Sequence, residues 1–235
     1  MNKNKAFISV VMPVYNEKLL INSAITETIS ALNKDFERFE LVIVDDGSTD
    51  NTYDLILNHA NKNNNIVIIR HDINENLGKS LHDGFLKANG EYVIFNSADL
   101  PLIPDDIKKL LEQKLPFDLL NIERIKYSGA SIWRRSVSFC NKVLLHMFFP
   151  INTKDFRDMN FTIILRKQIL SDILPKAKSP GFFMPEMILR AKDKKLNIKN
   201  IQINYQPRHK GKSHFGKMKD IIWSLRDMIL FRLKF

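Results

Sequence analysis

The sequence contains a single cysteine, Cys140, so it can form no internal disulfide, which is compatible with a reducing compartment. It also lacks any apolar run of the roughly 18–20 residues that a membrane-spanning helix needs. The longest candidates, residues 143–151 and 221–235, are too short or are interrupted by polar and charged side chains. The polar residues 1–5 lead directly into an apolar run, so we expect no signal peptide and a cytoplasmic protein.

Glycine-rich phosphate-binding loops are missing as well. The first apolar run ends in P-V-Y-N-E (13–17) and the second in D-D-G-S (45–48). Neither segment is the G-x-G-x-x-G turn of a dinucleotide-binding fold, and neither is a Walker loop. The phosphates of a bound nucleotide would therefore have to be held by a metal ion and by side chains.

Charge is distributed unevenly along the chain. Residues 1–100 hold 9 Lys/Arg and 14 Asp/Glu (net −5), whereas residues 101–235 hold 27 and 12 (net +15). A basic half suits phosphates, anionic lipid or nucleic acid, although scattered solvated lysines would give the same count. The apolar fraction of 44% and the charged fraction of 26% are ordinary for a globular domain that buries a core.

Apolar runs and helical patterns alternate in the first hundred residues, which predicts βαβ units, a mostly parallel sheet and helices on both faces. The expected strands are 7–12, 41–44, 66–69 and a fourth from residue 92, and the expected helices are 20–32, 52–60 and 79–88. The second half is less regular, with helices expected at 104–115, 133–149, 185–191 and 217–235 and strands at 118–122, 161–165 and 198–205.

The fourth strand ends in a carboxylate, Asp99, within Y-V-I-F-N-S-A-D-L-P (92–101). Ligands of open α/β sheets bind just outside the carboxyl ends of the strands. A carboxylate there can hold a divalent cation, and the cation can hold a diphosphate. The alternative interpretation is that Asp99 only caps the following turn.

Two further strand ends carry polar clusters, residues 13–17 and 45–50. The carboxyl ends of parallel strands point the same way, so the three ends can line one crevice. Tyr15 can stack on a base there, and Asp45 can accept a hydrogen bond from a base or a ribose. For both residues the alternative is turn and core packing.

Four segments in this order resemble family 2 glycosyltransferases, which have the Rossmann-like α/β GT-A fold: V-V-M-P-V-Y-N-E (10–17), L-V-I-V-D-D-G-S-T-D-N-T (41–52), N-x-N-L-G-K-S (74–80) and A-N-G-E-Y-V-I-F-N-S-A-D-L (88–100). The second half is most similar to the branch of dolichol-phosphate mannose synthases and bacterial polyprenyl-phosphate glycosyltransferases. That similarity lies at residues 123–124, 158–164, 183–191 and 205–214.

The resemblance implies roles for individual residues. Those implied to hold the nucleoside are Pro13, Tyr15, Glu17, Ile43 and Asp45, and those implied to hold ribose, diphosphate and Mg²⁺ or Mn²⁺ are Ala98 and Asp99, with Asp99 as metal ligand. Arg124 and Arg208 would contact the donor and acceptor phosphates, and Lys212 would support them. Asp158 would orient the acceptor or act as base, or it only caps a turn.

The sequence departs from the family pattern at the metal site. The family's D-x-D is Ser97-Ala98-Asp99 here, so one carboxylate is replaced by a hydroxyl, which is a poorer metal ligand. The arginine of the family's S-G-F-R segment is replaced by Ile164, and the lysine that closes the basic loop by His214. These changes fit a diverged acceptor, weaker use of metal, or loss of activity.

The resemblance implies an inverting transfer of a sugar from a UDP- or GDP-sugar to a polyprenyl phosphate on the cytoplasmic face of a membrane. A phosphate acceptor is already ionised near pH 7 and needs less help from a general base than a hydroxyl does. Two alternatives remain: transfer to a glycan hydroxyl in cell-surface polysaccharide synthesis, and a non-catalytic protein that binds nucleotide sugars. Nucleic acid is not an expected partner.

We expect a GT-A domain over residues 1–210 and a basic amphipathic segment over 211–235. Helices 133–149 and 223–235 combine aromatic, basic and apolar residues, which is typical of helices in a membrane interface, although helices packed on the sheet would show the same pattern. Residues 205–235 carry 8 Lys/Arg and 2 Asp/Glu, which favours contact with anionic lipid. A small membrane protein is a further expected partner.

Overall fold

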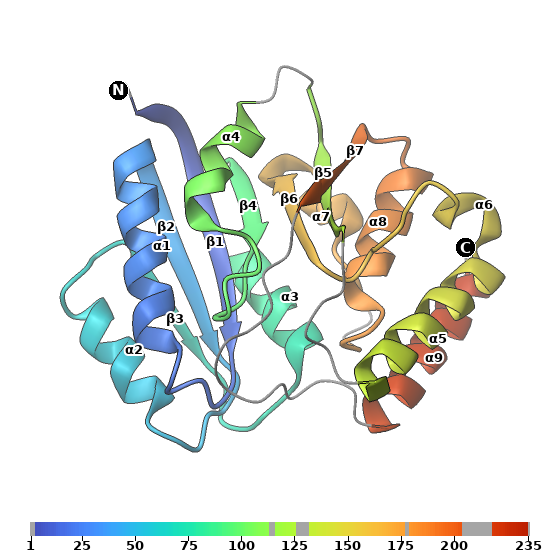
Figure 1. The fold of residues 1–235 in the computed structure, drawn as a ribbon, viewed down its shortest axis with the longest axis horizontal. Coiled ribbons are helices and arrows are strands. Elements are labelled where there is room, and N and C mark those ends of the chain that lie inside the picture. Colours follow the sequence, from blue (N-terminus) through green and yellow to red (C-terminus); the bar gives the residue numbers. More distant parts are fainter. Residues whose placement is uncertain (1–2, 113–115, 126–131, 177–178, 204–217, 235) are drawn as a thin grey trace.

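The computed structural model describes residues 3–112, 116–125, 132–176, 179–203 and 218–234 (Figure 1). Within them lies a seven-stranded sheet in the order β3-β2-β1-β4-β6-β5-β7. Its strands are β1 (Asn4–Val14), β2 (Phe36–Asp45), β3 (Ile66–Arg70), β4 (Tyr92–Phe95), β5 (Leu119–Arg124), β6 (Thr162–Arg166) and β7 (Ile198–Ile203). All neighbouring strands pair in parallel except β6, which is antiparallel to β4 and β5. The mostly parallel α/β sheet is thus confirmed.

The helices follow the predicted pattern closely in the first half and less closely in the second. They are α1 (Ile21–Asp35), α2 (Thr52–Ala60), α3 (Leu77–Lys87), α4 (Ile107–Leu111), α5 (Ile132–Phe148), α6 (Pro150–Thr153), α7 (Leu170–Ile173), α8 (Phe183–Asp193) and α9 (Met218–Arg232), with 3-10 turns η1 (Pro104–Asp106) and η2 (Lys167–Ile169). The predicted helix 104–115 is a 3-10 turn followed by one short helix. The short elements α6, η2 and α7 were not predicted, because segments this short carry too few residues to show a periodic pattern.

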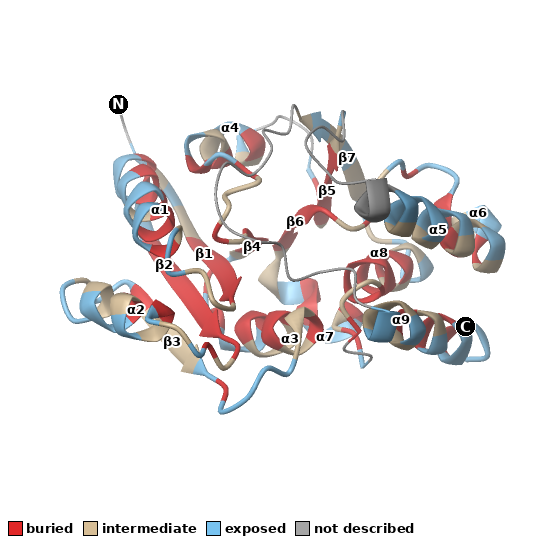
Figure 2. Ribbon diagram, turned by 60° about the horizontal axis from the view of Figure 1, so that its bottom comes forward, coloured by how far each residue is buried: buried red, intermediate tan, exposed pale blue. Residues whose placement is uncertain are grey.

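Helices cover both faces of the sheet, as predicted. Successive residues of a strand point to opposite faces, and in β1 Val10 and Met12 pack in one buried cluster with α1, whereas Val11 packs in the other with α3. The buried residues of α1, α2 and α4 belong to the first cluster, and those of α3, α7, α8 and α9 belong to the second. Figure 2 shows the buried side of α1 and α3 turned toward the sheet.

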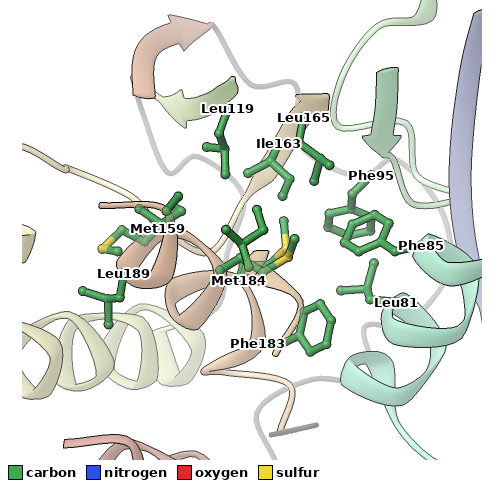
Figure 3. Packing of buried hydrophobic residues seen from close by; sticks show 14 of the residues in the cluster. Leu81, Phe85, Phe95, Leu119, Met159, Ile163, Leu165, Phe183, Met184 and Leu189 are labelled. Carbon is green, nitrogen blue, oxygen red and sulfur yellow. The ribbon is translucent and has the colours of Figure 1, made fainter. Parts of the chain in front are cut away.

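The second cluster joins the antiparallel part of the sheet to α3 and α8. Figure 3 shows Leu81 and Phe85 of α3, Ile163 and Leu165 of β6, and Phe183 of α8 converging on one centre. All five side chains are at most 1% exposed. Burial on this scale stabilises each side chain by about 1.5–3 kcal/mol relative to exposure. Helices α8 and α9 therefore pack in the same hydrophobic cluster as residues of β1 and β2.

Helices α5 and α9 lie side by side (Figure 1). The ring of Phe231 in α9 lies 5.8 Å from that of Phe149, which follows α5, and 5.6 Å from that of Phe182, which precedes α8. These contacts attach α9 to the domain. The predicted domain boundary near residue 210 and the basic loop 205–216 lie outside the described residues.

Candidate active site

The carboxyl ends of β1, β2 and β4 meet at one edge of the sheet. Val14 of β1 pairs with Asp45 of β2, and Val11 of β1 pairs with Phe95 of β4. A cavity of about 1120 Å³ opens at this edge. Predicted site residues that line it are Pro13, Tyr15, Glu17, Ser97, Ala98, Asp99, Arg124 and Asp158. Thus eight of the predicted residues, which come from four separate segments of the chain, share one space.

Two predicted residues, Ile43 and Asp45, are fully buried and are not among the residues that line the cavity. Two more, Arg208 and Lys212, lie outside the described residues. Ile43 belongs to the buried cluster on the α1 side of the sheet. Contact of these four residues with a substrate stays a prediction.

Asp45 is a buried carboxylate with one unsatisfied oxygen. Its Oδ1 accepts a hydrogen bond of 3.3 Å from the backbone N–H of Ser48, while Oδ2 has no hydrogen-bond partner among the described residues. The nearest cation is Arg70, whose Nε lies 3.8 Å from Oδ2. Burial raises the pKa of Asp45, and the hydrogen bonds to Ser48 and the charge of Arg70 only partly oppose it. A buried acceptor without a donor is costly, so this oxygen lowers the stability of the folded protein.

Asn16 ties the β1 end to the β2 end and was not predicted. Its backbone is in the left-handed region, with φ of 54°, where asparagine is enriched. Its side-chain Oδ1 accepts hydrogen bonds from the backbone N–H groups of Thr49 (2.8 Å) and Asp50 (3.3 Å). Beside it, the N–H of Glu17 donates to Thr52 Oγ1 at 2.8 Å. The wall that carries Tyr15 and Glu17 is thereby fixed against the β2 turn.

Asp46 binds the loop between β3 and α3 to the turn that follows β2. Its Oδ1 accepts from the N–H of Glu75, and its Oδ2 from the N–H of Asn76, both at 2.9 Å. The loop between β3 and α3 also packs closely against Gly47, whose φ is 69°. A Cβ added to Gly47 would lie 2.5 Å from the carbonyl carbon of Ile73. Asp46 therefore shapes the cavity by holding the loop that follows β3.

The loop after β4 presents Asp99. Its buried Asn96 donates from Nδ2 to the carbonyl of Leu102 at 2.8 Å and accepts the N–H of Leu102 at 3.2 Å, which closes the loop. Ser97 Oγ donates to Asp99 Oδ1 at 2.5 Å. The hydroxyl that replaces the family's first carboxylate therefore orients the second one. Asn96 is a further residue that the sequence did not single out.

The possible metal ligands near Asp99 are few, which fits a metal ion that is held mainly by the diphosphate of a ligand. Among the described residues, no group of three or more His, Cys, Asp and Glu side chains is arranged to hold a metal ion. Asp99 Oδ2 accepts no hydrogen bond from another described residue, so it is available as one carboxylate ligand. Mg²⁺ is commonly held by one or two carboxylates together with substrate phosphates.

Arg124 and Asp158, which the sequence placed in separate roles, form an ion pair. Both Nε and one terminal nitrogen of Arg124 lie 2.6 Å from Asp158 Oδ2, and the side chains are only 13% and 17% exposed. The guanidinium carbon lies 4.8 Å from the centre of the Phe161 ring. Asp158 Oδ1 accepts the N–H of Asn160 at 3.1 Å. Both oxygens of Asp158 are therefore already engaged by the protein.

The far wall of the cavity is formed by α5 and α9. Apolar side chains from both helices line it, namely Leu144, Leu145, Ile221 and Leu225. The same helices and α6 also expose large apolar residues to solvent, namely Phe139, Val143, Met147, Ile151, Met218, Ile222, Ile229, Leu230 and Leu233. Over the described ranges, no helix combines the length and apolar character needed to cross a bilayer.

Comparisons with known proteins identify the family of the chain. The profile of "Glycosyl transferase family 2" matches residues 9–174. Dolichyl-phosphate beta-glucosyltransferases of Trichomonas vaginalis and Saccharomyces cerevisiae are 24% and 28% identical over 252 and 253 residues. The matches cover 99% and 97% of this chain and 76% and 75% of those proteins.

A solved structure shows the fold independently. Glucosyl-3-phosphoglycerate synthase from Mycobacterium tuberculosis, crystallised with Mn²⁺, uridine diphosphate and phosphoglyceric acid, superposes with a TM-score of 0.71 at 18% identity, covering 97% of this chain and 78% of that one. The fold is therefore GT-A. Because the family profile spans well over half of the sequence, the chain belongs to glycosyl transferase family 2.

Proposed function

We propose that the protein is an inverting glycosyltransferase that moves a sugar from a UDP- or GDP-sugar to a polyprenyl phosphate at a membrane surface. One observation carries the proposal: a single cavity is lined by the strand-end loop with Asp99, by Arg124 and by apolar residues of α5 and α9. A nucleotide diphosphate suits the first part, a phosphate the second and an isoprenoid chain the third. Relatives named for dolichyl phosphate support the acceptor class.

The donor side is supported by Tyr15 and Asp99. Asp45 is fully buried and does not line the cavity, so its contact with a base ring N–H stays a prediction. Tyr15 lines the cavity from the adjacent strand end, where a base can stack on it. Asp99 would hold a divalent cation at the diphosphate, and such a cation would supply charge neutralisation for the leaving group. Ser97 keeps Asp99 in place for that contact.

The acceptor side favours a phosphate over a hydroxyl. A hydroxyl acceptor needs a general base within hydrogen-bond reach. Both oxygens of Asp158 already accept hydrogen bonds, from Arg124 and from the N–H of Asn160, so part of its acceptor capacity is committed to the protein. An ionised phosphate needs no such base, and it is attracted to the guanidinium that Asp158 holds in position. We therefore assign Asp158 to positioning Arg124.

Asp158→Asn separates the two roles. The amide retains the shape and one acceptor oxygen, so a positioning role predicts transfer to polyprenyl phosphate reduced by about tenfold. A role as base predicts loss of essentially all transfer with unchanged donor binding. Initial rates and donor titration of the same variant distinguish the two outcomes.

Contact with the membrane is proposed through the exposed apolar residues of α5, α6 and α9. Met147 and Ile151 are 71% and 74% exposed. An exposed apolar stripe flanked by Lys142, Lys219 and Arg232 is typical of a helix that lies in a lipid interface. Met147→Glu is expected to reduce sedimentation with anionic vesicles, whereas Leu86→Glu, at a 56% exposed position on α3, is a matched control expected to leave it unchanged.

The test of the function is sugar transfer from a panel of UDP- and GDP-sugars, with Mg²⁺ or Mn²⁺, in vesicles with and without undecaprenyl phosphate. A glycolipid that forms only with the polyprenyl phosphate supports the proposal. Transfer to a glycan hydroxyl without glycolipid would move the acceptor to a polysaccharide. No turnover from folded protein would favour a nucleotide-sugar-binding protein. Asp99→Asn should abolish transfer, and Asp105→Asn, which alters an exposed carboxylate paired with Lys34, should not.

A further inference from the structure

His71 is a buried histidine that lies behind the cavity wall. It follows β3 directly, is 7% exposed, and donates its backbone N–H to the carbonyl of Asp45 at 2.9 Å. Its ring connects two carboxylates: Nδ1 lies 2.8 Å from Asp46 Oδ1, and Nε2 lies 3.1 Å from Asp83 Oδ2. An ionised carboxylate only accepts hydrogen bonds, so the imidazole donates to both when both ring nitrogens carry protons.

Asp83, one of the two carboxylates that contact His71, is held in place by other side chains of α3. It lies on α3, where Lys79 and His82 also donate hydrogen bonds to its carboxylate. Burial alone would raise the pKa of Asp83, but the hydrogen bonds from Lys79, His82 and His71 outweigh burial and hold that pKa below its ordinary value. Asp83 is therefore an ionised anchor on a helix that packs into the core.

Asp46 is the other carboxylate that contacts His71, and it reaches the cavity. The oxygen that contacts His71 also accepts the N–H of Glu75, and its second oxygen accepts the N–H of Asn76. Asn76 has a φ of 82°, and its side chain accepts from the N–H of Gly78 at 2.8 Å, which caps α3. Asp46 and Asn76 both line the cavity. A shift of the Asp46 carboxylate would therefore move the cavity wall.

We propose that His71 is a positioning residue for the nucleotide side of the cavity. By bridging Asp46 to Asp83 it fixes the carboxylate that holds the loop 74–77, and this sets the affinity for a nucleoside diphosphate. The identity of that ligand rests on the proposed function, whereas the fixing of the loop does not. His71 itself touches no substrate.

Two measurements on the full chain test this proposal. The first is amide hydrogen exchange of Glu75 and Asn76, whose N–H groups donate to Asp46. The second is calorimetric titration with UDP and with GDP in the presence of Mn²⁺. His71→Ala is expected to speed exchange at both amides and to weaken nucleotide binding about tenfold. The kcat at saturating donor should stay within twofold, because the acceptor side is untouched.

Two further variants separate positioning from general stability. His71→Asn keeps a side-chain N–H toward Asp46 but loses the contact with Asp83, so its affinity should fall between wild type and His71→Ala. It also serves if His71→Ala does not fold. His82→Ala is the matched control, since His82 contacts Asp83 from the same helix without reaching Asp46, and its nucleotide affinity should be unchanged.

The outcomes are distinct. Unchanged exchange at Glu75 and Asn76 in a folded His71 variant would overturn the inference, as would an equal loss of affinity in His82→Ala. If wild-type protein binds neither UDP nor GDP, the proposed function fails, and the two amides still decide whether His71 fixes the loop. A drop in melting temperature without any change in exchange or affinity would reduce His71 to a stabilising core residue.

Discussion

Removing either member of the Arg124–Asp158 pair should destabilise the protein, and removing both should cost clearly less than the sum. The two side chains lie at the cavity, 34 positions apart in sequence, and together they join the end of β5 to the segment before β6. Each is mostly buried, so removing one side chain leaves the charge of the other without this ion pair in a poorly solvated place. That residual penalty is what a double-mutant cycle measures.

The magnitude follows from the geometry. Two guanidinium nitrogens lie 2.6 Å from one carboxylate oxygen. Breaking a fully buried pair costs about 3–5 kcal/mol. Because the side chains are 13% and 17% exposed, we expect about 3 kcal/mol for Asp158→Ala and for Arg124→Ala. The double variant should lose about 4 kcal/mol, which leaves a coupling of about 2 kcal/mol.

Urea unfolding followed by tryptophan fluorescence measures all four corners of the cycle. The matched control is the cycle on Lys192 and Asp155, an ion pair of 2.9 Å whose side chains are 28% and 57% exposed, where no measurable coupling is expected. Additive losses at Arg124 and Asp158 would refute the assignment of Asp158 to holding Arg124. The proposed preference for a phosphate acceptor would then lose its main structural support.

Three further predictions concern the strand-end loops. Gly47→Ala should cost about 3 kcal/mol in unfolding free energy, because it combines a positive φ with a Cβ that meets Ile73, and an unchanged urea midpoint would contradict this. The raised pKa of Asp45 means that stability is lost as pH rises through that pKa, so Asp45→Asn should raise the unfolding free energy at pH 7 and change it little at pH 3, as measured by urea unfolding at both pH values. Ser97→Asp should tighten Mn²⁺ binding in the presence of UDP, measured by electron paramagnetic resonance, and equal affinity would show that Ser97 does not limit the Asp99 site.

The sequence predicted the first half of the fold well because its strands are long, apolar and regularly separated by amphipathic helices. The sequence did not predict the order of the strands in the sheet. The insertion of antiparallel β6 between β4 and β5 depends on contacts such as Ile94 with Ile164 and Leu120 with Ile164, which join distant segments. Local periodicity carries no information on such pairing. The short elements α6, η2 and α7 and the early end of the helix after residue 104 were also missed, because such short segments show no period.

The candidate site was predictable where sheet geometry alone places residues. Tyr15 and Asp99 follow apolar strands, and parallel pairing brings those ends together. The residues that were missed are polar side chains whose partners lie far along the chain or in a loop: Asn16 and Asn96 bind backbone groups, and His71 contacts two carboxylates. The local indication was an asparagine one or two residues after a strand end, and at Asn16 this residue type tolerates the positive φ.

Under the proposed function two anionic substrates share the cavity, and the charge on its wall bears on how each is held. Its described lining carries five carboxylates, Glu17, Asp46, Asp99, Asp158 and Asp220, against three basic side chains, Arg124, Lys142 and Arg157. Two of the carboxylates are already compensated, Asp46 by N–H groups and His71, and Asp158 by Arg124. Donor phosphates are therefore expected to depend on a cation at Asp99, and acceptor phosphate on basic side chains of the second half.

This division gives opposite salt sensitivities. A cation in direct contact with the diphosphate is screened little, whereas attraction between an exposed basic surface and a lipid phosphate is screened strongly, since the Debye length falls from about 10 Å at 0.1 M to about 3 Å at 1 M salt. Raising salt from about 0.1 to 0.5 M should therefore raise the KM for polyprenyl phosphate several-fold and change UDP affinity with saturating Mn²⁺ less than twofold. Equal weakening of both would show that donor and acceptor are held by the same surface charges, and that Asp99 does not anchor the donor.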